Sequence, residues 1–355
     1  MQTATAGLAA PPPGAPGEGI RLGFDSYSIR AFEWKAIPLL DYAAGLKLDA
    51  IQLSSLDDYQ SLEPAYLQQV REHASRLGIS IDAGVGCLCP TSASWTPKYG
   101  EAAEYARLGL RVASSVGSKV MRCYLGTRAD RRGALPLEAH IAAMVKVLRA
   151  VRPLALELGV KIAVENHAGD MQAREVKMLI EEAGKDFVGS CLDTGNPMWV
   201  AEDPLLALET LEPYVLTTHI RDSVVFEHPR GAAVQWVALG DGNSIDFPRF
   251  FDLYRRLCPQ AAMQLEIITG RPPEVLPYFE RDFWKAFPHT PASEFARFAA
   301  LARRGHPFLG ATVIAGAANQ PRAVSEALKE QQRADLERSV GYAQRTLGAG
   351  SRWKA

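Results

Sequence analysis

The stretch LGVKIAVENHAGD, residues 158–170, places a helix-ending glycine, a short apolar strand and a polar cluster in direct succession. Gly159 is typical of a helix C-terminus, and the apolar, β-branched run after it is typical of a buried strand. The same glycine-then-strand order recurs in LGISI (77–81) and VGSKV (116–120). The repetition predicts a chain that alternates helices with strands.

Eight short apolar or β-branched runs of this kind are separated by segments with helical periodicity. They are residues 20–25, 49–54, 79–85, 119–126, 161–167, 188–195, 215–222 and 263–268. Alternating strands and helices imply parallel strands joined by crossovers, and eight units in about 250 residues fit an α/β fold, the (β/α)8 TIM barrel. A doubly wound sheet is the alternative, but it normally carries a glycine-rich nucleotide loop after an early strand, which this sequence lacks. We therefore predict a catalytic barrel over residues 20–270.

The segments outside this pattern have their own compositions. Residues 1–19 are rich in Ala, Pro and Gly, which predicts a disordered tail. Residues 271–355 predict a helical C-terminal extension that packs on the barrel or on a partner, and within it 326–348 form an amphipathic pattern. Residues 223–244 interrupt the last barrel repeats, and we expect them to form a long loop that acts as a lid or binding loop.

The charge balance excludes several classes of partner. The chain has 355 residues, with 39 Lys and Arg against 40 Asp and Glu, and a net charge of −1. This balance gives no global attraction to nucleic acid or to anionic lipid. No apolar run approaches the length of a membrane span. We expect a cytoplasmic protein that binds neither nucleic acid nor membrane.

Four ionisable residues stand at the ends of the last four predicted strands: Glu165, Asp193, His219 and Glu266. The first three are 28 and 26 residues apart, which is close to one strand–helix repeat. Because the C-terminal strand ends of a TIM barrel form its active-site face, the four side chains should meet in one bowl. Three carboxylates in one bowl would repel one another unless a cation lay between them. Three carboxylates and one imidazole form an oxygen-rich ligand set that suits Mn²⁺, Mg²⁺ or Co²⁺, with Zn²⁺ as a further alternative.

The motifs VENH (164–167), LDTGN (192–196), THIRD (218–222) and LGDGN (239–243), with the glutamate of QLEI, resemble the xylose-isomerase-like barrel superfamily, and within it the sugar phosphate isomerase/epimerase family. The resemblance covers roughly residues 20–270. It implies one divalent metal ion, commonly Mn²⁺, bound by the four residues at the strand ends. It also implies that Glu165 and Glu266 are the catalytic acid and base on opposite faces of a sugar.

Further candidates surround these four. His167 lies two residues beyond Glu165 on the same strand, so it should face the same side and bind a sugar hydroxyl or act as a base. Arg221, by the same argument, points inward to a substrate oxygen, a phosphate or a carboxylate. Asn196, Trp199 and Trp236 complete the set of predicted substrate contacts, and the two tryptophans are expected on loops at the mouth.

Two reactions on one metal site remain open from the sequence. The first is sugar isomerisation or epimerisation through a metal-stabilised enediolate. The second is a lyase reaction on a keto-sugar, as in relatives that dehydrate inososes or cleave oxidised C-glycosides, with His167 as the base. We expect a homo-oligomer, or a hetero-oligomer with a small second subunit, with which C-glycoside cleavage is associated. A DNA endonuclease would need more histidines on the early strands, and a non-catalytic sugar-binding relative would be expected to have lost a carboxylate.

Overall fold

Eight parallel strands form a nearly closed barrel in the computed structural model, which describes residues 19–316 and 320–354. The predicted tail, residues 1–19, lies outside the described residues except for Gly19. The strands are β1 (Leu22–Asp25), β2 (Ala50–Leu53), β3 (Ser80–Cys87), β4 (Val120–Tyr124), β5 (Lys161–Glu165), β6 (Val188–Asp193), β7 (Val215–His219) and β10 (Met263–Leu265). β10 pairs with β1, and a bridge between Ile220 and Leu265 links β7 to β10.

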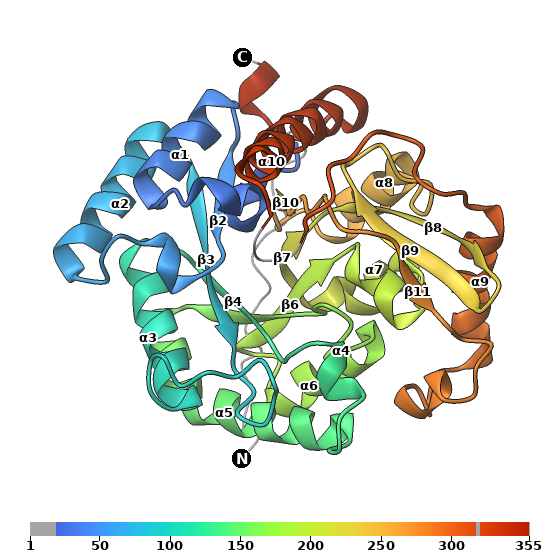
Figure 1. The fold of residues 1–355 in the computed structure, drawn as a ribbon. Helices are drawn as coiled ribbons and strands as arrows, with labels where there is room; N and C mark the ends of the chain where they lie inside the picture. The colour runs from blue at the N-terminus through green and yellow to red at the C-terminus, as the bar shows by residue number, and fades with distance from the viewer. Residues whose placement is uncertain (1–18, 317–319, 355) are drawn as a thin grey trace.

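Helices surround the strands, as Figure 1 shows with the barrel seen along its axis. They are α1 (Ala36–Gly45), α2 (Pro64–Leu77), α3 (Ala102–Ser115), α4 (Arg128–Arg131), α5 (Leu137–Leu158), α6 (Ala173–Ala183), α7 (Pro204–Leu211) and α8 (Phe247–Leu257). Gly159 ends α5 with a φ of 62°, a left-handed conformation that favours glycine and turns the chain into β5. The predicted α/β barrel is confirmed.

Short helices η1 (Ser26–Phe32), η2 (Leu56–Asp58) and η3 (Asn196–Val200) follow β1, β2 and β6, and η4 (Glu212–Tyr214) precedes β7. η1 and η3 come directly after β1 and β6, so they line the C-terminal face of the barrel. Below that face, the barrel interior is polar, because the Thr217 hydroxyl on β7 lies 2.7 Å from Asp82 Oδ2 and 3.0 Å from Gln52 Oε1. The main apolar core therefore lies between the strands and the helices.

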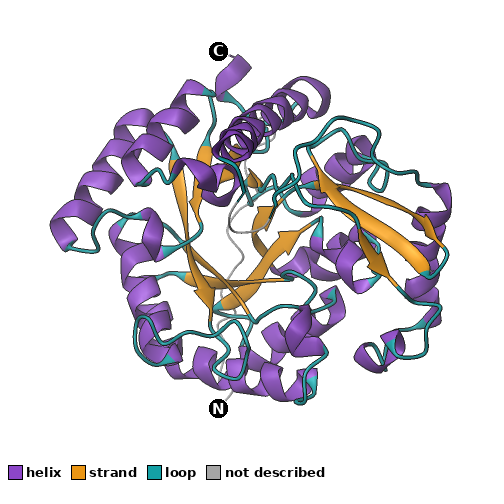
Figure 2. Ribbon diagram, in the orientation of Figure 1, coloured by secondary structure: helices purple, strands orange, loops and turns teal. Residues whose placement is uncertain are grey.

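The insertion 223–244 is largely a β-hairpin, so the prediction of a long loop is wrong. β8 (Asp222–His228) pairs antiparallel with β9 (Gly231–Val237) across a two-residue turn. β11 (Glu274–Leu276) joins β9 to make a second, three-stranded sheet beside the barrel (Figure 2). Length favoured the loop interpretation, whereas the β-branched and apolar run in VVF and AAVQWV favours strands.

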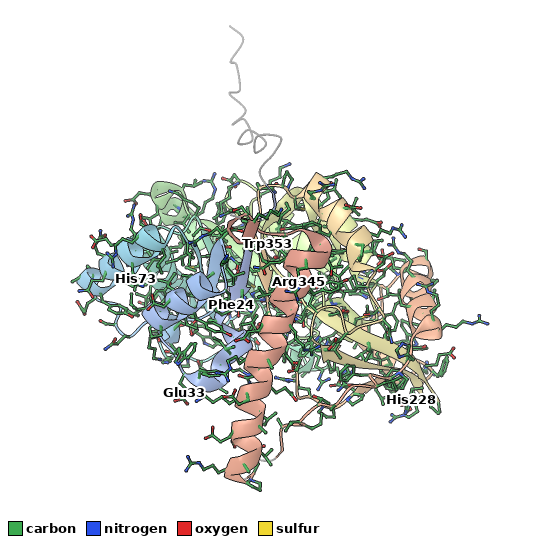
Figure 3. The ribbon with its side chains drawn as sticks, turned by 90° about the horizontal axis from the view of Figure 1, so that it is seen from above. Phe24, Glu33, His73, His228, Arg345 and Trp353 are labelled. Atoms are coloured by element: carbon green, nitrogen blue, oxygen red, sulfur yellow. The ribbon has the colours of Figure 1, made fainter. Side chains whose placement is uncertain are left out.

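The C-terminal extension is helical only in part. It contains β11, the turns η5 (Phe283–Ala286), η6 (Ala343–Leu347) and η7 (Arg352–Lys354), and the helices α9 (Ala292–Arg304) and α10 (Arg322–Tyr342). α10 runs between the elements near Phe24 and the sheet that bears His228, as Figure 3 shows. Its buried residues include Leu336 and Val340, in agreement with the amphipathic pattern expected over residues 326–348. Among the described residues, no helix combines the length and the apolar character needed to cross a membrane.

α10 is tied to the barrel's own chain. The side-chain oxygen of Gln332 accepts a hydrogen bond from the backbone N–H of Ala31 in η1 (3.0 Å). Ser339 accepts one from the backbone N–H of Leu239 (3.0 Å). The extension therefore packs on the barrel, while its boundaries as a separate unit stay a prediction.

Candidate metal centre and active site

The four predicted ligands come together at the C-terminal ends of neighbouring strands. Glu165, Asp193 and His219 are the last residues of β5, β6 and β7, and Glu266 directly follows β10. One ligand atom from each lies within 4.8 Å of those of the other three, and all four residues are buried. The barrel registers bring this about, since Asp193 lies opposite His219 in the pairing of β6 with β7.

The imidazole of His219 lies at the centre of this cluster. Its Nδ1 is 3.2 Å from Glu165 Oε1 and 3.5 Å from Glu266 Oε2, and it has no hydrogen-bond partner within the part of the chain that the structure describes. Its Nε2 is 3.3 Å from Asp25 Oδ2 and also contacts the side-chain amide of Gln52. When Nε2 carries the proton and donates it to Asp25, the Nδ1 lone pair is directed at the carboxylates, which is the tautomer that a metal ligand requires.

The charges in the cluster call for an additional cation. Burial lowers the pKa of His219, but Glu165, Glu266 and Asp25 outweigh it and raise that pKa well above the ordinary value. Nδ1 therefore attracts a positive charge, which either a proton or a metal ion supplies. Four carboxylates and two guanidiniums give a formal charge of −2 with neutral His219, and one divalent cation would bring it to zero. The charged groups are Asp25, Glu165, Asp193, Glu266, Arg122 and Arg221.

Two arginines neutralise part of the carboxylate charge that we expected a metal ion alone to neutralise. Arg122 donates from Nε to Glu165 Oε2 (2.6 Å), and Arg221 donates from Nε to Asp193 Oδ2 (2.9 Å). The Arg221 guanidinium also forms an ion pair with Glu266. Arg221 is only 1% exposed, so its contacts here are with carboxylates.

These contacts separate the two glutamates electrostatically. Burial raises the pKa of Glu165, but the guanidinium of Arg122 and the imidazole of His219 outweigh it and hold that pKa well below the ordinary value. Burial raises the pKa of Glu266 to about 7, although Arg221 opposes the shift. The two carboxylates therefore differ in proton affinity although both contact His219.

His167 is oriented as a neutral base. Its ring stacks on Tyr124 with centroids 3.9 Å apart, and its Nδ1 lies 2.7 Å from the carbonyl oxygen of Gly126. A carbonyl oxygen only accepts, so Nδ1 carries the proton and Nε2 keeps a lone pair. Burial lowers the pKa of His167 to about 4, which keeps the ring neutral near pH 7.

The other predicted contacts take different positions. Asn196 is 2% exposed, and its amide nitrogen donates to Glu165 Oε1 (3.2 Å) and to the carbonyl oxygen of Asn166 (2.9 Å). Trp199 lies in η3, whereas Trp236 lies on β9, so its predicted loop position is wrong. The two indole rings meet edge to face with centroids 4.9 Å apart. Asn196 positions Glu165 in this structure, and its predicted role in substrate binding, like that of the tryptophans, stays a prediction.

Three residues of the cluster were missed from the sequence: Asp25, Gln52 and Arg122. Asp25 ends β1 as Asp193 ends β6, so its position at a strand end was an available signal. Gln52 and Arg122 lie within β2 and β4, where the sequence gives no signal that a polar side chain reaches the active-site face. Their roles become visible only when the barrel is closed.

The comparison with protein families matches residues 40–276 to the xylose isomerase-like TIM barrel family. The chain belongs to this family. The match covers most of the barrel, including Glu165, Asp193, His219 and Glu266. Membership agrees with the strand order and with the position of the cluster at the C-terminal strand ends.

Curated relatives of this family member are distant. The uncharacterized protein YihM of Escherichia coli (strain K12) is 24% identical over 209 residues, which are 58% of this chain and 58% of the relative. The 3-oxo-isoapionate decarboxylase of Pectobacterium atrosepticum is 22% identical over 211 residues, 57% of this chain and 68% of the relative. The matched region thus spans less than two thirds of the length of YihM.

Solved structures share the barrel at low identity. A D-psicose 3-epimerase crystallised in the presence of D-fructose has a TM-score of 0.57 and 17% identity, over 93% of this chain and 100% of that chain. The 3-keto-D-glucoside 4-epimerase YcjR of E. coli has a TM-score of 0.55 and 15% identity, over 79% of this chain and 98% of that chain. At these identities the likeness shows the fold.

Proposed function

We propose that this protein is a divalent-metal-dependent enzyme that removes a proton next to the carbonyl group of a sugar or sugar derivative. The observation that carries the proposal is the buried meeting of Glu165, Asp193, His219 and Glu266, with a His219 Nδ1 that has no hydrogen-bond partner among the described residues. Four such ligands from four strand ends provide a hard, mostly oxygen donor set that suits Mn²⁺, with Mg²⁺, Co²⁺ and Zn²⁺ as alternatives.

A bound divalent cation would polarise the substrate carbonyl and stabilise the negative charge that forms when the neighbouring C–H loses its proton. The protein's own groups hold and orient this site. Arg122 and Asn196 fix Glu165, Arg221 fixes Asp193, and Asp25 fixes His219. Such prior orientation lowers the barrier because little reorganisation is left for the reaction step.

We favour isomerisation or epimerisation as the outcome. β5 and β10, which position Glu165 and Glu266, are separated by β6 and β7 in the barrel, so the two carboxylates approach the cluster from different sides. One carboxylate can take a proton from one face of a substrate carbon, while the other returns a proton to the opposite face. The difference in their proton affinities suits such a division into base and acid.

A lyase reaction on a keto-sugar is the second candidate, and the geometry of His167 favours it. Nε2 of His167 is a base outside the cluster, with its ring fixed by Tyr124 and Gly126. In this reaction His167 takes the proton next to the ketone, the electron pair forms the enolate, and the enolate expels a β-substituent. The curated relative that is a 3-oxo-isoapionate decarboxylase supports keto-sugar derivatives as the substrate class.

One experiment separates the two outcomes. The Mn²⁺-loaded protein is incubated in D₂O with free ketoses and, separately, with a 3-oxo-C-glycoside. Deuterium in unchanged or epimerised ketose, without released aglycone, supports isomerisation. Aglycone release without epimer would establish the lyase instead. If exhaustive chelation leaves either activity unchanged, metal dependence is refuted.

A further inference from the structure

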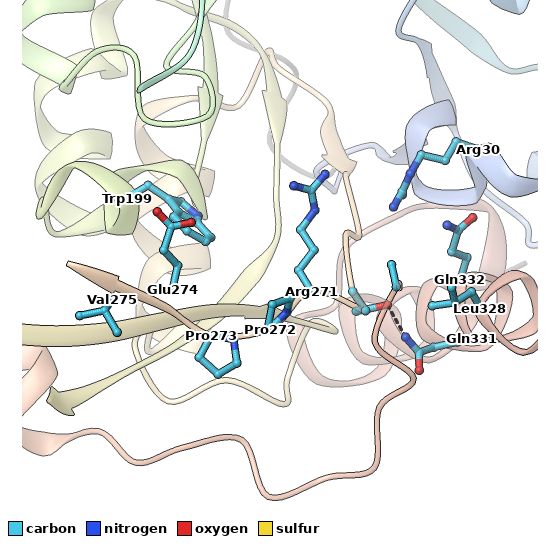
Figure 4. Close-up of a pocket in the computed structure, with 13 residues that line it drawn as sticks. Arg30, Trp199, Arg271, Pro272, Pro273, Glu274, Val275, Leu328, Gln331 and Gln332 are labelled. Carbon is cyan, nitrogen blue, oxygen red and sulfur yellow. Dashed lines mark hydrogen bonds between the residues drawn. The ribbon is translucent and has the colours of Figure 1, made fainter. Parts of the chain in front are cut away.

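A cavity of about 520 Å³ opens at the C-terminal face of the barrel. Its walls come from segments that follow barrel strands: Arg30 after β1, Trp199 after β6, and residues 269–275 after β10. α10 closes one side with Gln331 and Gln332 (Figure 4). This volume falls within the roughly 300–1,000 Å³ range of small-molecule sites. The cavity lies on the face that carries the metal cluster, where a substrate would enter.

Two arginines in the cavity wall have no acidic partner in the part of the chain that the structure describes. Arg30 and Arg271 come from different segments and direct their side chains into the same space (Figure 4). Within the described residues, neither forms an ion pair with a carboxylate. Burial lowers the pKa of Arg30, and the nearby positive charge of Arg271 lowers it further.

The single carboxylate in the wall is already neutralised. Glu274 forms an ion pair with Arg128, which leaves no acid in this wall to balance Arg30 and Arg271. Gln332 accepts a hydrogen bond from Ala31, but its side-chain nitrogen has no partner within the described chain and remains available as a donor. The wall thus presents two cations and a neutral hydrogen-bond donor.

The indole of Trp236 lies against an arginine of this wall and against an arginine of the buried cluster. The Arg271 guanidinium lies 5.5 Å from the ring centroid of Trp236, and the Arg221 guanidinium lies 4.5 Å from the same centroid. Arg221 in turn contacts Asp193 and Glu266. The wall of the cavity and the cluster therefore share the Trp236 indole as a neighbour, which places Arg271 close to the cluster.

We propose that Arg30 and Arg271 form an oxyanion subsite that binds a carboxylate or phosphate group of the sugar substrate. The inference rests on the proposed function and adds the substrate class, an anionic sugar derivative. With a divalent cation bound, the buried cluster is formally neutral. The positive charges of Arg30 and Arg271 at the mouth are then not balanced by the cluster, and an anionic group of the substrate would balance them. A charge-assisted hydrogen bond to a guanidinium contributes more than a neutral one, and paired arginines suit planar or tetrahedral oxyanions.

Three sugars that differ only at C6 test the proposal: D-fructose, D-fructuronate and D-fructose 6-phosphate. Their dissociation constants are measured by calorimetry on the Mn²⁺-loaded protein and on Arg271→Gln, Arg30→Gln and Arg281→Gln. Arg281 is exposed, lies outside the cavity wall and has no side-chain hydrogen bond within the described chain, so its variant is the matched control for charge. Arg271 is also exposed and donates no hydrogen bond there, so its variant should fold.

We expect the wild type to bind one anionic sugar at least tenfold more tightly than D-fructose. Arg271→Gln and Arg30→Gln should remove this preference, and Arg281→Gln should keep it. The sugar that gains affinity tells whether the group is a carboxylate or a phosphate. Equal affinity for the three sugars, no binding of any, or equal effects of Arg271→Gln and Arg281→Gln would overturn the subsite. Mn²⁺ titration without sugar reports on the metal proposal separately, so failure of either proposal is recognised on its own.

Discussion

Replacing Asp25 with asparagine should weaken metal binding although Asp25 is not one of the four ligands. Its Oδ2 lies 3.3 Å from His219 Nε2 and sets the tautomer that leaves Nδ1 free. The amide of asparagine can still accept the Nε2 proton, but it no longer supplies the negative charge that makes the imidazole a stronger ligand. The loss should therefore appear in metal affinity.

The size of the effect follows from this contact. Mutation of a group that orients a metal-bound histidine costs 10–100-fold in metal affinity, which is about 1.4–2.7 kcal/mol. The fold should tolerate the change, because Asp25 also caps η1 by accepting from the backbone N–H of Tyr27 (2.9 Å), and asparagine caps helices as well as aspartate does. The unfolding midpoint of the metal-free variant should thus stay near that of the wild type.

Asp82→Asn is the matched control for this experiment. Asp82 is another carboxylate of the barrel interior, and it accepts from Thr217 (2.7 Å) and Gln264 (3.1 Å) without contact to the cluster. Isothermal titration with Mn²⁺ on chelator-treated protein gives both affinities. Wild-type affinity in Asp25→Asn, or an equal loss in Asp82→Asn, would refute the assignment of His219 as a ligand oriented from β1.

Three further predictions concern the site and the fold. Glu165→Gln and Glu266→Gln should each lower turnover at least 100-fold, as expected for a lost acid or base, and near-normal rates in both would contradict their roles. Burial raises the pKa of Glu202 to about 8, whereas in the unfolded chain this carboxyl ionises near pH 4.5, so the wild type loses stability as pH rises between these values. Glu202→Gln lacks this ionisation, so its free energy of unfolding relative to wild type should rise by roughly 3 kcal/mol from pH 5 to pH 8 in urea titrations. A difference that does not change with pH would argue against this. Leu336→Ala should lower the free energy of unfolding by about 2–5 kcal/mol, because Leu336 is fully buried between α10 and the barrel, and a loss below 1 kcal/mol would show that this packing adds little.

The strand ends of the barrel were predictable because two independent signals coincide there. An apolar run gives the strand, and the ionisable residue that ends it gives the position on the catalytic face. Glu165, Asp193 and His219 satisfy both signals at nearly equal spacing, and the structure brings them together with Glu266. Asp25 satisfies both signals too, but it ends the first strand, outside the regular spacing of the late strands.

Other parts of the site depend on contacts that no local pattern records. Arg122 lies inside β4, and only its register against β5 places it beside Glu165. β11 has three residues and exists because β9 offers it an edge. Within the hairpin, the length of the insertion suggested a loop, whereas its alternation of β-branched residues across Pro229 and Arg230 favours strands. Short strands of this kind are decided by their partners.

The division of charge within the molecule implies a division of function. The buried cluster belongs to the strand ends, and its carboxylates, guanidiniums and imidazole come to neutrality with one divalent cation. The mouth is lined by η1, the segment after β10 and α10, and it contains Arg30 and Arg271, which form no ion pair among the described residues. On the proposed function, a change in the cluster would therefore alter the reaction itself, whereas a change at Arg30 or Arg271 would alter which substrate binds. Because α10 supplies one wall of the mouth, the C-terminal extension is where we expect substrate selection in this barrel to be set.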